Sequence, residues 1–184
     1  MKNPLGWIVV VAFLAGAAGC NEAKEQGKTG RQEVLLQTDT VWGREVKQLR
    51  SQVVDETVLF RKKEYRIHIK READNSLTMV KTEEGETFKD NRILLQIKTE
   101  AERIVFSKVF RKESFASMVE ARFMPYVMLD GLAFDKTSEK GFHFVAGMSY
   151  PQSDFYVPIS IVISPDGKLT MFKTDFMEET STEE

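Results

Sequence analysis

Residues 141–167, GFHFVAGMSYPQSDFYVPISIVISPDG, carry the clearest structural pattern in the chain. Every second residue is apolar on each side of residues 150–154, which is the period of a strand with one buried face. The segment Ser164-Pro165-Asp166-Gly167 predicts a turn, because proline presets its own φ angle and glycine accepts a positive one. Residues 168–174 then return as a further strand. The alternating apolar sets are Phe142, Phe144, Ala146 and Met148, then Val157, Ile159, Ile161 and Ile163.

Pro158 lies inside the second of these strands. Proline has no N–H to give to a neighbouring strand, so it is tolerated at a sheet edge or at a bulge. The sequence therefore predicts an edge position or a bulge at Pro158.

The same two-residue rhythm extends upstream to Val34. Residues 64–71 alternate most sharply, and residues 93–97 are expected to pair with residues 104–110 around a hairpin loop at 99–102. A turn is expected around Glu84-Gly85-Glu86, and residues 135–141 read as a polar loop. The remaining predicted strands are residues 40–46, with Trp42 and Val46 on one face, 52–60, 77–82 and 127–134.

Residues 114–124 break this rhythm and predict the one helix of the domain. Phe115, Met118, Val119 and Phe123 recur at helical spacing. Ser114 is a suitable N-cap, and Pro125 would end the helix.

These elements predict a mainly β protein with one short helix. Turn signals at close intervals favour an antiparallel meander that forms a sandwich or a partly open barrel. The predicted domain spans residues 34–177, and the acidic segment 178–184 has no apolar side chain to bury, which predicts a disordered tail.

Residues 1–19 have the three parts of a secretory signal. Lys2 follows the amino terminus, residues 7–15 are apolar, and Ala17-Ala18-Gly19 are small. A membrane-spanning helix is the weaker interpretation, because the apolar run is short of the roughly 20 residues that cross a bilayer.

Ala17-Ala18-Gly19-Cys20 resembles the bacterial lipobox, with Ala17 in place of the usual leucine. The resemblance implies cleavage between Gly19 and Cys20 and attachment of acyl chains such as palmitate to Cys20. Asn21 in place of aspartate implies sorting to the outer membrane. Glu22 and Glu25 faintly resemble acidic surface-export signals, and the periplasmic or surface face stays open. Residues 20–33 would then be the lipidated cysteine and a flexible polar tether.

Composition narrows the class of partner. The chain has 26 Lys and Arg against 28 Asp and Glu, a net charge of −2, which argues against a nucleic-acid partner. Its single cysteine leaves no disulfide within the chain. A hydrophobic content of 42% with 13 phenylalanines fits a folded domain.

No motif in the sequence points to catalysis, a metal or a cofactor other than the covalent lipid. His68 lies between Arg66 and Lys70 and reads as a solvated side chain. His143 lies opposite the Phe142 and Phe144 face. The candidate ligand-binding residues are Trp42, His143, Tyr150 and Tyr156, with packing in the core or at its rim as the stronger interpretation for the aromatic ones.

Several segments together resemble a family of small Bacteroidota lipoproteins, the domain of unknown function four-seven-three-eight. They are the lipobox, Asp39-Thr40-Val41-Trp42, residues 110–115, residues 141–144 and residues 163–167. The family implies a lipoprotein and no established activity.

The sequence thus favours a non-enzymatic envelope lipoprotein that binds a ligand, a glycan or a partner protein. Two alternatives remain: an envelope hydrolase that uses carboxylates with His143, and a structural or assembly lipoprotein.

The lipid anchor predicts the behaviour of Cys20→Ala. Without the thiol there is no acceptor for the lipid, so labelling by a palmitate-type probe should be lost and precursor-sized protein should accumulate. Asn21→Ala serves as the control and should keep its label. Unchanged labelling of Cys20→Ala would contradict the anchor.

Overall fold

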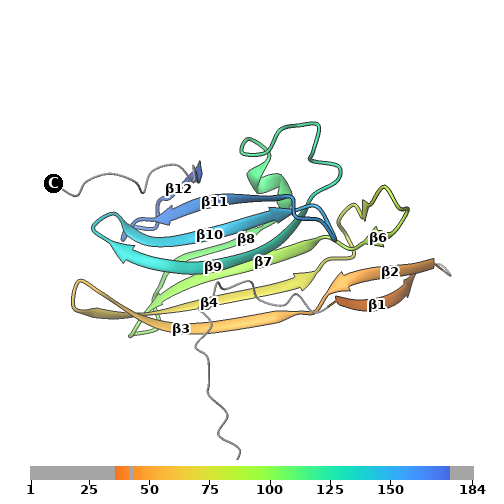
Figure 1. The fold of residues 1–184 in the computed structure, drawn as a ribbon. Coiled ribbons are helices and arrows are strands. Elements are labelled where there is room, and N and C mark those ends of the chain that lie inside the picture. The colour runs from red at the N-terminus through yellow and green to blue at the C-terminus, as the bar shows by residue number, and fades with distance from the viewer. Residues whose placement is uncertain (1–35, 42–43, 175–184) are drawn as a thin grey trace, which may run out of the picture. The chain divides into compact units, whose positions relative to one another are not determined.

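The computed structural model describes residues 36–41 and 44–174 (Figure 1). It separates a unit of residues 1–33 from a unit of residues 34–184, and every described residue belongs to the second. The described part is mainly β, with one 3-10 helix. Its elements are β1 (Leu36–Val41), β2 (Arg44–Leu49), β3 (Gln52–Phe60), β4 (Lys63–Ala73), β5 (Val80–Lys81), β6 (Thr87–Phe88), β7 (Asn91–Thr99), β8 (Ile104–Phe110), η1 (Lys112–Phe115), β9 (Met128–Ser138), β10 (Gly141–Ser149), β11 (Tyr156–Ile163) and β12 (Leu169–Lys173).

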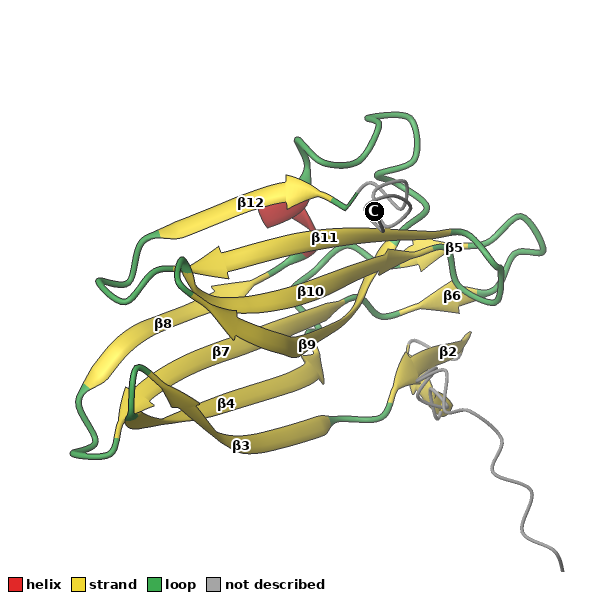
Figure 2. Ribbon diagram, turned by 60° about the vertical axis from the view of Figure 1, so that its left-hand side comes forward, coloured by secondary structure: helices red, strands yellow, loops and turns green. Residues whose placement is uncertain are grey.

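Two four-stranded antiparallel sheets make up most of the fold (Figures 1 and 2). Sheet I has the order β3-β4-β7-β8 and sheet II the order β12-β11-β10-β9. Consecutive strands pair with each other within β3–β4, β7–β8, β9–β10, β10–β11 and β11–β12, as expected for a meander. The predicted pairing of residues 93–97 with 104–110 is confirmed, with Ile93 opposite Phe110 and Ile97 opposite Phe106.

One hydrophobic core lies between sheets I and II, so the two sheets form a sandwich. Alternate residues of β4 and β7 face β10 and β11, which is what the period of two in the sequence requires. The Phe142 ring lies 5.1 Å from the Phe60 ring and 4.9 Å from the Tyr65 ring, centroid to centroid. The fully buried core side chains include Ile67, Ile93, Leu95, Ile97, Phe110, Phe115, Leu129, Phe142, Phe144 and Met148.

A smaller sheet, sheet III, has the order β1-β2-β6-β5. It has its own buried cluster of Leu49, Val80, Phe88 and Met128. Met128 is the first residue of β9, so this cluster joins sheet III to sheet II.

The predicted helix at residues 114–124 is wrong. Only η1 is helical, and isolated turns follow it, with Met118 N–H donating to the Phe115 carbonyl and Phe123 N–H to the Glu120 carbonyl. Phe115 and Val119 are nevertheless buried, so turns satisfy the apolar pattern. An isolated stretch of this length is a marginal helix, and Pro125 disfavours helical backbone at the preceding residue. Ser114 is not the N-cap, because Arg111 holds that position in η1; Ser114 is three residues later, and its Oγ accepts a hydrogen bond from the Arg111 N–H at 3.1 Å.

Three strand boundaries differ from the prediction. Residues 40–46 are not one strand, because Val41 pairs with Arg44 at the end of the β1–β2 hairpin. The expected loop at 135–141 is strand as far as Ser138, since β9 continues along β10. The strand predicted at 77–82 shortens to β5.

The two predicted turns are confirmed, whereas the prediction of an edge position or a bulge at Pro158 is wrong. Ser164 to Gly167 forms the predicted turn, and Gly85 and Gly167 have φ angles of 86° and 84°. β11 is an interior strand with continuous register against β10, so neither an edge strand nor a bulge is found there. Pro158 is tolerated because the pairing with β12 ends one residue later, at Ile159.

The core packing predicts a large effect for Phe142→Ala. Removing a fully buried ring that touches two aromatic neighbours should lower the free energy of unfolding by about 3–5 kcal/mol. Phe172→Ala is the matched control, because Phe172 is 47% exposed and its loss should change stability by less than about 0.5 kcal/mol. Urea denaturation measures both, and equal effects would contradict the packing described.

Candidate functional site

The predicted site residues divide into two groups. Cys20 and Trp42 lie outside the described residues. His143, Tyr150 and Tyr156 are described, on β10, just after β10 and at the start of β11. Tyr156 pairs with Ser149, six residues along β10 from His143, a separation of about 20 Å at the rise of a strand. These three residues therefore do not form one site.

His143 holds the tip of the β9–β10 hairpin. Its Nε2 lies 2.6 Å from Ser138 Oγ, which also accepts a hydrogen bond from the Lys140 N–H at 3.2 Å. Burial, followed by the charges of Lys136 and Lys140, lowers the pKa of His143, and Asp135 opposes this effect. The neutral imidazole can accept a hydrogen bond from the Ser138 hydroxyl. Ser138 and His143 are therefore arranged as a nucleophile and a general base would be.

The two tyrosines have separate structural roles. The Tyr150 hydroxyl accepts a hydrogen bond from the Glu83 N–H at 2.8 Å, which fixes the turn at residues 82–86. The Tyr156 ring covers Gly147, where an added Cβ would lie 2.4 Å from Tyr156 Cε2. Burial raises the pKa of Tyr156, as does Asp130, yet 47% of the side chain stays exposed.

Tyr156 borders the outer face of sheet II, whose central rows carry no charged side chain, while Asp130 of β9 supplies a negative charge at the border beside Tyr156. Residues that alternate with the buried set of β10 and β11 point outward there. We call this surface the uncharged face. Its accessible residues are Ala133, Val145, Ser160 and Phe172 in one row, Gly131 in the next, and Tyr156, while Gly147 and Pro158 of the second row are buried.

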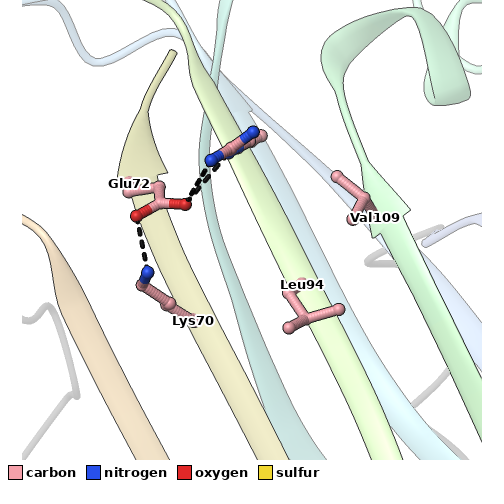
Figure 3. Close-up of a pocket in the computed structure, with 5 residues that line it drawn as sticks. Lys70, Glu72, Leu94 and Val109 are labelled. Carbon is pink, nitrogen blue, oxygen red and sulfur yellow. Dashed lines mark hydrogen bonds and ion pairs between the residues drawn. The ribbon is translucent and has the colours of Figure 1, made fainter.

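The outer face of sheet I is different, because it carries ion pairs. Glu72 contacts Lys70 Nζ at 2.7 Å and donors of Arg92 at 2.8 and 2.9 Å (Figure 3). Hydrogen bonds from Lys70 and then Arg92 lower the pKa of the Glu72 carboxyl. These three side chains border a hollow that Leu94 and Val109 also line. Both cations there share the Glu72 carboxylate, and Arg92 Nη1 also lies 3.8 Å from Asp74 Oδ2, so each cation already has an acidic partner.

A buried polar cluster lies where the sheets meet, and the sequence reasoning missed it. Asp90 is fully buried, and its Oδ1 accepts hydrogen bonds from the N–H groups of Asn91 at 2.8 Å and Leu129 at 2.9 Å. Lys112 Nζ lies 3.3 Å from Asp90 Oδ2 and donates to the Val127 carbonyl at 3.3 Å. The one available signal was the polar run Lys89-Asp90-Asn91 directly before an apolar strand.

Burial dominates the electrostatics of this cluster. It raises the pKa of the Asp90 carboxyl, while the two backbone N–H groups and Lys112 act in the opposite direction. Desolvation disfavours the charged form, and a nearby cation favours it. Lys112 is therefore the counter-charge that a carboxylate at this position needs.

Within residues 36–41 and 44–174, no group of three or more His, Cys, Asp and Glu side chains is placed to hold a metal ion. No helix in that part of the chain is long and apolar enough to span a membrane.

The fold and the cluster define the class: an antiparallel β-sandwich of sheets I and II, with the buried Asp90 carboxyl, which directly precedes β7 of sheet I, hydrogen-bonded to Leu129 of β9 in sheet II. The family model described as a domain of unknown function (DUF4738) matches residues 33–171. The chain belongs to this family, as the resemblance predicted. No curated protein sequence matches the chain.

The buried ion pair predicts a large cost for Lys112→Met. Without the Lys112 ammonium, the Asp90 carboxylate is buried with no counter-charge, which should lower the free energy of unfolding of the variant by about 3–5 kcal/mol. The pKa of Asp90 is raised by folding, so the folded state binds a proton on the Asp90 carboxyl more tightly than the unfolded chain does. The stability that this proton contributes is therefore lost as pH rises through the folded pKa. The cost of Lys112→Met should therefore shrink on acidification.

The control is Lys108→Met. Lys108 is exposed on β8 with its Nζ 5.3 Å from the Phe110 ring centroid, so its loss should change stability by less than about 1 kcal/mol. Urea denaturation at mildly acidic and mildly alkaline pH measures both variants. A cost for Lys112→Met that is small, or that grows on acidification, would contradict the ion pair.

Proposed function

We propose that the protein is a lipid-anchored lipoprotein of the outer membrane and that its sandwich domain is a non-enzymatic module that binds an envelope protein. The uncharged face is the observation that carries the binding role. The lipobox-like segment ending at Cys20 supports the anchor, and membership in a domain family of unknown function assigns no competing activity.

The anchor has a simple physical basis. Each buried methylene contributes about 0.8 kcal/mol, so one acyl chain binds a bilayer reversibly and two or three hold it permanently. The polar residues 21–33 then act as the tether of the domain. A tethered domain is confined close to the membrane surface, which raises its effective concentration toward other envelope proteins.

The contrast between the two outer faces supports the position of the binding surface. On sheet I, the exposed apolar side chains Val53 and Val109 share a row with Lys70, so ion pairs and polar contacts such as Gln96 Nε2 to Ser107 Oγ at 3.2 Å are interspersed with apolar groups. On sheet II, Phe172 and Tyr156 are each 47% exposed beside small residues. Surfaces that expose aromatic side chains among few charged ones are typical of protein interfaces.

The chemistry of this face favours a protein over a glycan. Six of its residues, Gly131, Ala133, Val145, Gly147, Pro158 and Phe172, have no polar side-chain atom. A sugar presents hydroxyl groups that need hydrogen-bond partners when they are desolvated. An apolar protein surface makes no such demand, because it gains free energy from burial alone.

The hydrolase alternative is favoured by one observation, the Ser138–His143 contact of 2.6 Å. In this version Ser138, rather than a carboxylate, is the partner of His143. Labelling of Ser138 by a fluorophosphonate that is lost in His143→Ala would favour the hydrolase over the binding module.

Site-specific photo-crosslinking in intact cells tests the binding role. A photoreactive residue at Ala133 should give one adduct of defined mass, because Ala133 is exposed on the uncharged face. The same residue at Ser107, exposed on the outer face of sheet I, is the matched control and should give none. Adding Val145→Lys to the Ala133 probe should reduce the adduct several-fold, since a desolvated charge disfavours an apolar contact. Equal adducts at both positions, or no adduct at Ala133, would contradict the proposal.

A further inference from the structure

The side-chain nitrogen of Lys112 contacts the carboxyl group of Asp90 in the buried part of the domain. The two side chains are 8% and 0% exposed, and Lys112 Nζ lies 3.3 Å from Asp90 Oδ2. We propose that these two side chains condense into an intramolecular amide, an isopeptide bond between Lys112 Nζ and Asp90 Cγ. This inference is independent of the proposed function, because it concerns the covalent structure of the domain.

The surroundings of Asp90 suit the electrophile of such a reaction. Attack on Cγ places negative charge on one carboxyl oxygen in the tetrahedral intermediate. Oδ1 already accepts hydrogen bonds from two backbone N–H groups, that of Asn91 at 2.8 Å and that of Leu129 at 2.9 Å. Donors at these distances are those of an oxyanion hole, and both belong to the backbone at the starts of β7 and β9, so they are held before the reaction begins.

The other oxygen suits a leaving group. Asp90 Oδ2 makes no hydrogen bond among the described residues and contacts the Lys112 ammonium. Attack needs the unprotonated amine, so a proton must move from Nζ to Oδ2, 3.3 Å away, before the new bond forms. Burial raises the pKa of Asp90, which favours the protonated carboxyl group as the electrophile.

The position of the amine is also fixed. Lys112 Nζ donates to the Val127 carbonyl at 3.3 Å, and Lys112 is the first residue of η1, whose last residue, Phe115, is fully buried. An amine held beside a carboxyl group reacts as if its local concentration were far above any value reached in solution. This proximity compensates for the low reactivity of an unactivated acid.

The reaction balances without a further reactant. The Nζ lone pair forms a bond to Cγ, the Cγ–Oδ2 bond breaks, and Oδ2 leaves as water. Starting from ammonium and carboxylate, the nitrogen gives up two protons, and both leave with Oδ2. No atom is oxidised or reduced. The product joins the start of β7 to the segment after β8 in a chain whose single cysteine allows no internal disulfide.

Tryptic mass spectrometry of the full chain, purified from membranes and denatured before digestion, tests the proposal. Trypsin cuts after Lys89, Arg92, Arg111 and Arg122, and it does not cut after an acylated lysine. The expected product is therefore residues 90–92 joined to residues 112–122, lighter than the two separate peptides by one water. Recovery of residues 90–92 and 113–122 only as separate peptides would overturn the proposal and leave a non-covalent ion pair.

Two variants make the assignment specific. Lys112→Arg keeps a cation opposite Asp90 without the reacting amine, so the joined peptide should disappear. Lys108→Arg changes an exposed lysine on β8 and should leave it at the wild-type level. A joined species that persists in Lys112→Arg would overturn the assignment. If Lys112→Arg does not fold, the wild-type digest decides the question alone.

Discussion

Asp90 is the residue on which the arrangement of the three sheets depends. Its Oδ1 accepts hydrogen bonds from the N–H groups of Asn91, the first residue of β7 in sheet I, and Leu129, the second residue of β9 in sheet II. The Asn91 side chain returns a hydrogen bond to the Leu129 carbonyl at 2.8 Å. On the other side, the Lys89 N–H donates to the Lys47 carbonyl of β2 at 2.9 Å. Three consecutive residues thus contact strands of all three sheets.

Packing and polar contacts have different roles in this arrangement. The apolar core supplies most of the stabilisation, because burial of side chains such as Phe142 and Leu95 scales with the area removed from water. Apolar contacts alone do not fix how two sheets are placed along each other, since neighbouring packings bury similar areas. A buried oxygen with defined donors, as Asp90 Oδ1 is, is satisfied in only one of them, and we infer that Asp90 selects the observed one.

Alternation in the sequence was enough to predict the mainly β class, the β7–β8 hairpin and the turn at Ser164 to Gly167. It failed where tertiary contacts override local pattern. Apolar spacing at residues 114–124 predicted a helix, and the core accepts the same side chains from successive turns. The Asp90 cluster was missed because Lys112 and Asp90 are charged types that usually face water, and a strand pattern does not show which strand ends meet. His143 and Tyr156 do lie on one sheet, but the register separates them.

Native-state hydrogen exchange tests the role of Asp90 most directly, because it reports the free energy at which each amide opens. If Asp90 joins the sheets, the amides of Asn91 and Leu129 should exchange only through global unfolding, together with those of Ile93 and Leu95 in the centre of sheet I. Exchange of Asn91 and Leu129 through a local opening of much lower free energy, while Ile93 and Leu95 stay protected, would contradict the account.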